Sequence, residues 1–153
     1  MNTFEISQLM HLTPEFYGVH PCCEIEVFRR KRVGSLIVNT DPHNKPGQHW
    51  VVVYIEEKTM TFFDSFGREI NEFAEPFATI MNDFTRGYQV ISNRKQYQHL
   101  KSDTCGLWSI YFILSKVLNV NNFHVFTEDT LRNETVMINQ LLDFQEIIKK
   151  KLM

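Results

Sequence analysis

The pattern of apolar and polar positions divides the chain into short strands and amphipathic helices. An uninterrupted apolar run, Leu36-Ile37-Val38, predicts a buried strand over 34–39. Residues 50–55 are all β-branched or aromatic, so 49–56 is the best candidate for a central strand. Glu56-Glu57-Lys58 then turns the chain back, and 59–64 is predicted to be the antiparallel partner. A further short strand is predicted over 88–92.

Helical periodicity fills much of the remaining sequence. Helices are predicted over 3–11, over 71–86 with an interruption near Pro76, over 105–118 and over 127–151. Asp103 or Thr104 is the natural N-cap of the third helix. Loops are predicted through the segment that holds Pro14, Gly18 and Pro21, and over the turn-rich stretch 41–47.

Length and composition indicate one domain spanning 1–153. A chain of 153 residues with 43% hydrophobic positions should bury about 68–70% of its unfolded surface, without help from disulfides or metals. The net charge of -2 does not call for nucleic acid. Two basic runs, 29–32 and 149–151, are interpreted as a solvated loop and a frayed helix end, with an anionic partner as the alternative.

The cysteine pattern favours a reducing compartment and no metal. Three cysteines is an odd count, and Cys22 and Cys23 are neighbours, which rarely bridge. His20, Cys22, Cys23 and His43 fall in a short region, but no Cys-x-x-Cys pair supports zinc. No phosphate-binding or dinucleotide motif occurs, so we expect no cofactor. Without a signal-like N-terminus or a long apolar segment, we expect a soluble intracellular protein.

Four polar residues supply, in chain order, the parts of a cysteine hydrolase: His49, Asp64, Gln98 and Cys105. His49 opens one predicted strand and Asp64 closes its antiparallel partner, so hairpin pairing places both at the same edge of the sheet. Asp64 is expected to accept a hydrogen bond from Nδ1 of His49 and to leave Nε2 toward the thiol. The alternative for Asp64 is a cap of the turn that follows it.

Cys105 is expected in the first turn of its helix, where backbone N–H groups and the macrodipole favour a thiolate. A buried structural cysteine is the alternative. Gln98, or its competitor Gln96, is expected to supply one oxyanion donor, and the Cys105 backbone N–H the other. Trp50 is expected to shield the base or border the substrate groove, unless it belongs to the core, and Gly106 is expected beside the substrate.

These motifs resemble the adenain-like cysteine proteases of adenoviruses, related DNA viruses, virophages and Polinton/Maverick elements. The order His, Asp/Glu, Gln, Cys is the reverse of that in papain. The broader clan includes SUMO and ubiquitin-like protein deconjugating proteases, which typically have one residue fewer between the glutamine and the cysteine. The matching positions are His49-Trp50, Asp64-Ser65-Phe66-Gly67, Gln98, Cys105-Gly106-Leu107 and Phe16-Tyr17-Gly18-Val19.

The resemblance implies an α+β fold in which a mixed, mainly antiparallel central sheet is flanked by helices, with the nucleophile at a helix N-terminus. It also implies an endopeptidase that cleaves viral capsid or core precursor proteins during virion maturation, at small-residue sites and often after glycine. The alternatives are a SUMO or ubiquitin-like protein deconjugating protease and a catalytically inactive binding module.

The resemblance further implies protein substrates, no membrane partner, a monomer, and a location in the host cytoplasm or nucleus, in the virus factory and in the virion. Adenoviral enzymes are basic and use DNA and a disulfide-linked peptide as activators. This chain is slightly acidic, and Gly87 stands where the linking cysteine would fall. We therefore expect a weaker dependence on both activators, although composition alone leaves nucleic-acid binding open.

Overall fold

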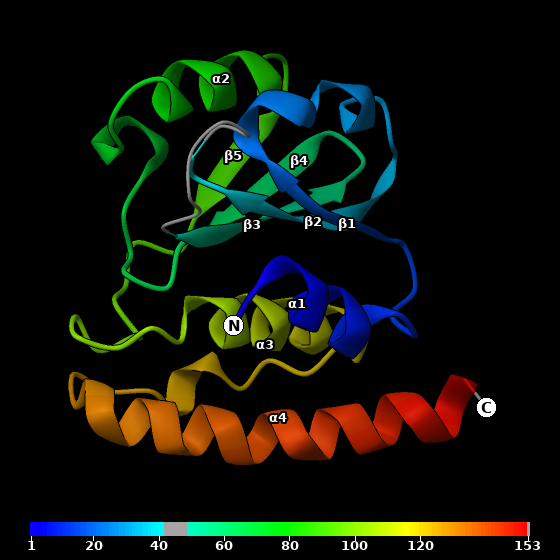
Figure 1. Ribbon diagram of the computed structural model, residues 1–153, viewed down its shortest axis with the longest axis vertical. Coiled ribbons are helices and arrows are strands. Elements are labelled where there is room, and N and C mark those ends of the chain that lie inside the picture. Colours follow the sequence, from blue (N-terminus) through cyan, green and yellow to red (C-terminus); the bar gives the residue numbers. More distant parts are fainter. Residues whose placement is uncertain (42–48, 153) are drawn as a thin grey trace.

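A five-stranded sheet lies between two layers of helices (Figure 1). The structure, a computed structural model, describes residues 1–41 and 49–152; apart from Asp41, the turn-rich stretch predicted over 41–47 lies outside the described residues. The helix α2 covers one face of the sheet, while α1, α3 and α4 lie on the other (Figure 1). Over the described residues, no helix combines the length and apolar character needed to cross a bilayer.

The sheet is mixed, as expected, with order β1-β2-β3-β4-β5. Antiparallel pairs, β2 with β3 and β3 with β4, occupy its centre and form the longer ladders, whereas β1 and β5 pair in parallel at the two edges. Each of the four predicted strands is confirmed to within one residue at either end. The strands are β1 (Phe16–Pro21), β2 (Val33–Asn39), β3 (Trp50–Glu56), β4 (Thr59–Phe63) and β5 (Gln89–Ser92).

The loop predicted through Gly18 and Pro21 is wrong, because these residues form β1. Gly18 has φ +105°, and the pairing of β1 with β2 shifts register between Phe16 and Val19. The strand is therefore irregular, and apolar and polar residues do not alternate regularly along it. Pro21 is tolerated because it ends an edge strand. The strand exists through pairing with β2, a contact that local sequence does not encode.

The predicted helices are present with two changes at their ends. The segment 71–86 splits into a 3₁₀ turn (Ile70–Glu72) and α2 (Phe77–Phe84), with Pro76 at the N-cap of α2. The last helix begins at residue 130 rather than 127, because the side chain of Asn133 folds back on Thr127. The other helices are α1 (Thr3–Met10), α3 (Cys105–Val117) and α4 (Thr130–Leu152).

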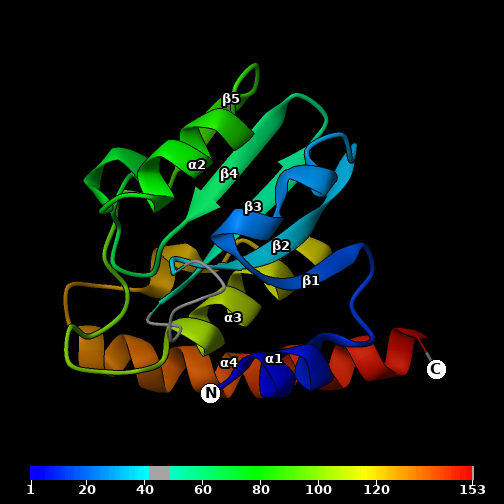
Figure 2. The same cartoon turned by 45° about the horizontal axis from the view of Figure 1, so that its top comes forward.

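The side chains of β3 alternate between two cores. Val52 packs with α3 and α4 on one face of the sheet, while Val51 and Val53 pack with α2 on the other. The helix α3 lies between the sheet and α4, so almost its whole surface is buried (Figure 2). Burial on both sides fixes where α3 begins, and hence where Cys105 lies relative to the start of β3.

The two basic runs lie on opposite sides of the sheet. Residues 29–32 follow a 3₁₀ turn (Glu26–Phe28) on the side of α2, whereas 149–151 end α4 (Figures 1 and 2). Much of the first run already has partners: Arg29 Nε donates to the Phe84 carbonyl at 3.1 Å, and Arg32 pairs with Glu57 at 2.9 Å. Folding therefore does not gather the two runs into one patch.

Candidate active site

His49 and Asp64 meet at the open end of the β3–β4 hairpin, as hairpin pairing predicts. His49 directly precedes β3, Asp64 directly follows β4, and His49 Nε2 lies 2.5 Å from Asp64 Oδ1. The expected choice of ring nitrogen is wrong, because Nε2 rather than Nδ1 faces the carboxylate. The carboxylate lies at the far tip of the imidazole, and this leaves Nδ1 for the interaction with the thiol of Cys105.

Asp64 is fully buried, and both of its oxygens are hydrogen bonded. Oδ1 faces His49, while Oδ2 accepts the Arg68 backbone N–H at 3.0 Å and Arg68 Nε at 2.9 Å. Burial raises the pKa of this carboxyl, but the hydrogen bonds and charges of His49 and Arg68 outweigh burial and lower the pKa overall. Asp64 therefore remains a carboxylate and favours the imidazolium form of His49.

The turn after Asp64 is held from two directions. Asn93 accepts the Asp64 N–H at 3.0 Å and donates to the Asp64 carbonyl at 2.7 Å. Gly67 donates to the same carbonyl at 2.8 Å and has φ +80°. A Cβ at Gly67 would lie 2.7 Å from the carbonyl carbon of Lys95, so only glycine fits. Asp64 is therefore not only a cap of the turn, and the contacts of Asn93 and Gly67 hold this turn in one conformation.

Cys105 is the first residue of α3 and is 6% exposed. Burial raises the pKa of its thiol. The hydrogen bond and charge of His49, with the backbone N–H groups of Trp50 and Gly106, more than offset burial and lower the pKa overall. His49 shows the matching shift, because Asp64 and Cys105 outweigh the lowering effect of burial and raise its pKa. These shifts favour a thiolate–imidazolium pair.

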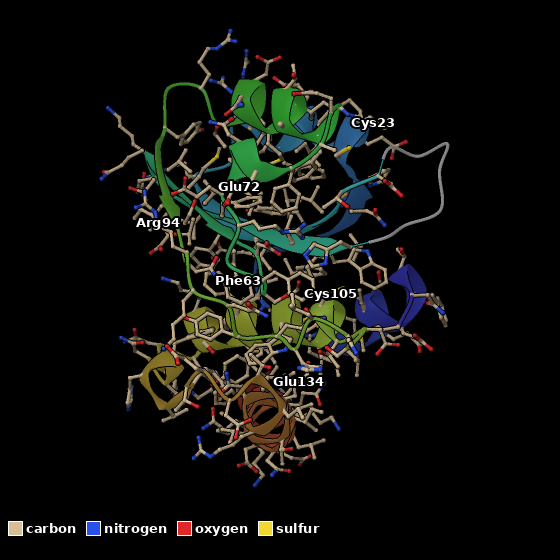
Figure 3. The ribbon with its side chains drawn as sticks, turned by 90° about the vertical axis from the view of Figure 1, so that its left-hand side faces the viewer. Cys23, Phe63, Glu72, Arg94, Cys105 and Glu134 are labelled. Carbon is tan, nitrogen blue, oxygen red and sulfur yellow. The ribbon has the colours of Figure 1, made fainter. Side chains whose placement is uncertain are left out.

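The start of α3 has no side-chain cap, although Thr104 occupies the N-cap position as expected. Its hydroxyl instead donates to Glu134 on α4 at 2.7 Å. In Figure 3, Glu134 approaches the start of α3 from the side opposite the sheet. The first backbone N–H groups of a helix lack intrahelical acceptors, and the role of the Cys105 N–H as an oxyanion donor stays a prediction.

Gln98 lies in the loop before Cys105, and its amide is fully engaged. Oε1 accepts from Ser65 Oγ at 2.5 Å, and Nε2 donates to Ser102 O at 3.0 Å and to Ser102 Oγ at 3.1 Å. A carbonyl can only accept, so the Ser102 carbonyl fixes the orientation of the amide. The competitor Gln96 donates to the backbone carbonyl of Gln98 at 3.0 Å. Gln96 therefore supports Gln98.

Two residues of α4 that the sequence did not single out secure this loop. Glu134 Oε1 accepts the His99 N–H at 3.3 Å and the hydroxyls of Ser102 and Thr104. Asn133 is fully buried, and its Nδ2 donates to the Tyr97 carbonyl at 3.3 Å. Their partners in this loop lie thirty or more positions earlier in the chain, and no local motif signals these contacts. The helix α4 thus braces the segment that carries Gln98 and Cys105.

Phe66, rather than Trp50, shields the imidazole. The Phe66 ring stacks on His49 with centroids 5.1 Å apart and planes at 19°. Trp50 packs toward Gly106 instead, where an added Cβ would lie 3.3 Å from Trp50 Cε3. The two predicted substrate contacts therefore adjoin each other beside Cys105, and their role toward substrate stays a prediction. The sequence contained one indication that Phe66 lies near the base, because this residue belongs to the Asp64-Ser65-Phe66-Gly67 motif.

A cavity of about 510 Å³ adjoins His49. Its walls include the rings of Phe66, Phe73 and Phe77, together with Arg68 and Glu72. His49 lines this cavity and Cys105 does not, so its role toward a substrate stays a prediction.

The residues considered for zinc do not gather into a site in the described part of the chain. His20 Nε2 lies 2.7 Å from the Tyr17 carbonyl, and burial raises the pKa of Cys22 to about 11. Cys23 lies on the far side of the sheet from Cys105 (Figure 3), and His43 falls outside the described residues. Across 1–41 and 49–152, no group of three or more His, Cys, Asp or Glu side chains could hold a metal ion.

Two adenoviral proteins and one bacterial domain are similar to this chain. The "Protease" of bovine adenovirus 4 is 26% identical over 115 residues, which cover 68% of this chain and 57% of that protein. The "Protease" of ovine adenovirus D serotype 7 is 21% identical over 135 residues, covering 81% and 64%. The chain thus spans less than two thirds of either relative.

The central domain of the uncharacterized Lpg1148 protein from Legionella pneumophila shares the fold. Its TM-score is 0.52 at 16% identity, covering 97% of this chain and 98% of that one. A family profile described as adenovirus endoprotease matches residues 16–146, which include all four predicted catalytic residues. The expected α+β fold and the resemblance to adenain-like proteases are confirmed, and the chain belongs to the adenovirus endoprotease family.

Proposed function

We propose that this protein is a cysteine endopeptidase with Cys105 as nucleophile and His49 as general base and acid. The observation that carries the proposal is the continuous chain from a buried carboxylate to a thiol. Asp64 lies 2.5 Å from His49 Nε2, and the interaction of the other side of the imidazole with Cys105 lowers the pKa of that thiol. A purely structural cysteine buried among apolar groups would have a raised pKa instead, as Cys22 does.

The geometry supports a two-step acyl transfer. The Cys105 thiolate attacks the carbonyl carbon of the scissile peptide, and the His49 imidazolium gives its proton to the departing amine. His49, now neutral, takes a proton from water, which attacks the thioester and releases the new carboxyl end and the thiolate. The Cys105 N–H and one N–H of Gln98 stabilise the oxyanion in both steps. For this, Gln98 exchanges its bond to Ser102 Oγ for one to the substrate and keeps the bond to the Ser102 carbonyl.

We propose viral capsid or core precursor proteins as substrates, cut at small residues such as glycine during virion maturation. The similarity to adenoviral proteases supports this assignment. The proposal places the enzyme in the host cytoplasm or nucleus and in the virion. Sequencing the new N-termini of virion proteins after incubation with the enzyme tests it. Cuts scattered among large residues would contradict this substrate assignment.

Thiol reactivity tests the chemistry without a known substrate. Iodoacetamide at neutral pH should label Cys105 faster than the exposed Cys23, and His49→Ala should remove this advantage. Cys105→Ala should abolish cleavage, whereas the matched control Cys23→Ala should not. If cleavage survives Cys105→Ala, or Cys105 reacts no faster than Cys23, the proposal is wrong. Reaction with a SUMO or ubiquitin vinyl sulfone would support a deconjugating protease instead.

A further inference from the structure

Arg68 contacts the proposed active site by hydrogen bonding to the carboxylate of Asp64, which is fully buried. Its Nε and backbone N–H both donate to Asp64 Oδ2, at 2.9 and 3.0 Å, while the other oxygen of Asp64 serves His49. Asp64 is 0% exposed, whereas the Arg68 side chain is 39% exposed. One buried carboxylate is therefore shared by two cationic groups, and Arg68 reaches it from the solvent side.

The guanidinium is also fixed by aromatic rings. Its Cζ lies 4.3 Å from the centre of the Phe73 ring and 5.4 Å from that of Phe66. Phe66 is the ring that stacks on the imidazole of His49. Arg68 thus contacts both the carboxylate that orients the base and the ring that covers it. A planar guanidinium suits stacking and directed hydrogen bonding, while an ammonium group does not.

The charges of the three buried groups, Cys105, His49 and Asp64, do not sum to zero, and the partly exposed Arg68 supplies the missing positive charge. A reactive Cys105 thiolate and Asp64 carboxylate carry two negative charges, and the His49 imidazolium carries one positive charge. Arg68 supplies the second positive charge by direct contact with Asp64. Uncompensated charge is costly in a buried site. Without Arg68 the excess negative charge would disfavour the thiolate.

We propose that Arg68 is a positioning residue of this enzyme, which holds Asp64 against His49 and balances the site so that Cys105 is a thiolate at neutral pH. The inference rests on the proposed function. Other charged groups border the same cavity, namely Asp41 ahead of β3 and Glu72 and Glu75 on the segment before α2. Glu72 and Glu75 accept backbone N–H bonds of their own segment. Among the charged side chains that line the cavity, only Arg68 and His49 bond Asp64 directly in the described part of the chain.

The test is the pH dependence of Cys105 alkylation by iodoacetamide, which requires no substrate. Arg68→Gln removes a positive charge, and this raises the pKa of every nearby titrating group. The acid limb of the curve of alkylation rate against pH, over which the Cys105 thiolate forms, should therefore move to higher pH by about half a unit to one unit. Arg68→Lys keeps the charge, so the limb should stay near that of the wild type, while turnover falls because the Nε bond is lost. The matched control is Arg86→Gln, which breaks an exposed arginine–aspartate pair and should shift nothing.

A double variant keeps the test decisive if Arg68→Gln folds poorly. Arg68→Gln combined with Asp64→Asn removes one charge of each sign, so the acid limb should return toward its wild-type position. If the limb of Arg68→Gln coincides with that of the wild type, or the limb of the double variant lies well above that of the wild type, the inference is wrong while the protease assignment stands. If wild-type Cys105 reacts no faster than Cys23, the protease assignment fails first.

Discussion

Replacing Gln98 by alanine tests the oxyanion assignment most directly. The side chain is 1% exposed and makes three hydrogen bonds, one from Ser65 Oγ and two to Ser102. In the proposed mechanism, one N–H of the Gln98 amide bonds the substrate oxygen only when negative charge develops there. Removing one such donor typically costs about 10²–10³ in turnover, or about 2.7–4 kcal/mol. We expect Gln98→Ala to lower kcat by that factor.

Gln98→Ala should also lower the free energy of unfolding, by an amount that follows from the number of hydrogen bonds lost. Each lost neutral hydrogen bond contributes about 0.5–1.5 kcal/mol, so three of them make Gln98→Ala destabilising by about 1.5–4.5 kcal/mol. This is a sizeable part of a typical unfolding free energy of about 5–15 kcal/mol. The assay must therefore be run at a temperature where a melting curve shows the variant fully folded.

Alkylation of Cys105 separates the two effects, because that reaction has no oxyanion. We expect the alkylation rate of folded Gln98→Ala to match the wild type while peptide cleavage falls. The matched control is Gln96→Ala, which removes only the bond to the Gln98 carbonyl and should reduce cleavage modestly. An unchanged kcat for Gln98→Ala would remove this residue from the mechanism. Parallel loss of alkylation and cleavage would show that Gln98 only holds the loop together.

Three further predictions concern the brace from α4, the dependence of stability on pH, and the response to DNA. Glu134→Gln replaces the charged acceptor that braces the loop before α3. It should lower the free energy of unfolding measured in urea by about 1–3 kcal/mol and slow cleavage. A variant as stable and active as the wild type would contradict the role of Glu134 as a brace. The lowered pKa of Asp64 stabilises the folded protein at pH values above the unfolded pKa of about 3.9, and this stability is lost as the pH falls through the folded pKa. The raised pKa of His49 acts in the opposite direction. Its stabilisation is complete below about pH 6.5 and is lost as the pH rises through the folded pKa. The difference in unfolding free energy between the wild type and Asp64→Asn should therefore be largest between about pH 4 and 6.5, and a difference that stays constant from acid to alkaline pH would refute this account. Cleavage should depend weakly on duplex DNA because phosphate binding scales with the basic residues that reach the backbone; a large stimulation that disappears in a salt series would defeat this prediction.

Local sequence predicts the hairpin and both of its polar ends for a definite physical reason. The β-branched and aromatic run at 50–55 and the turn at 56–58 specify two antiparallel strands, and antiparallel pairing brings the start of one beside the end of the other. The proximity of His49 and Asp64 follows from that geometry without tertiary information. The start of α3 is predictable in the same way, since apolar spacing defines where the helix begins.

Contacts between distant segments are what the sequence pattern could not supply. The strand β1 depends on parallel pairing with β2 across a register shift. The ring nitrogen that faces Asp64 depends on the direction in which the carboxylate approaches the imidazole. The hydroxyl of Thr104 leaves its expected capping role because Glu134, thirty residues later, offers a charged acceptor. In each case a remote partner outweighs a local preference.

The brace from α4 connects the far end of the sequence to the proposed chemistry. Ser102 accepts from Gln98 Nε2 and donates to Glu134, so the position of the amide depends on a carboxylate of α4. Asn133, one residue earlier, holds the Tyr97 carbonyl next to Gln98. If α4 shifts, the loop loses these acceptors and donors together, whereas the His49–Asp64 pair, which the hairpin positions, keeps its geometry. Disturbing α4 should therefore weaken oxyanion stabilisation before it affects the reactivity of the thiol.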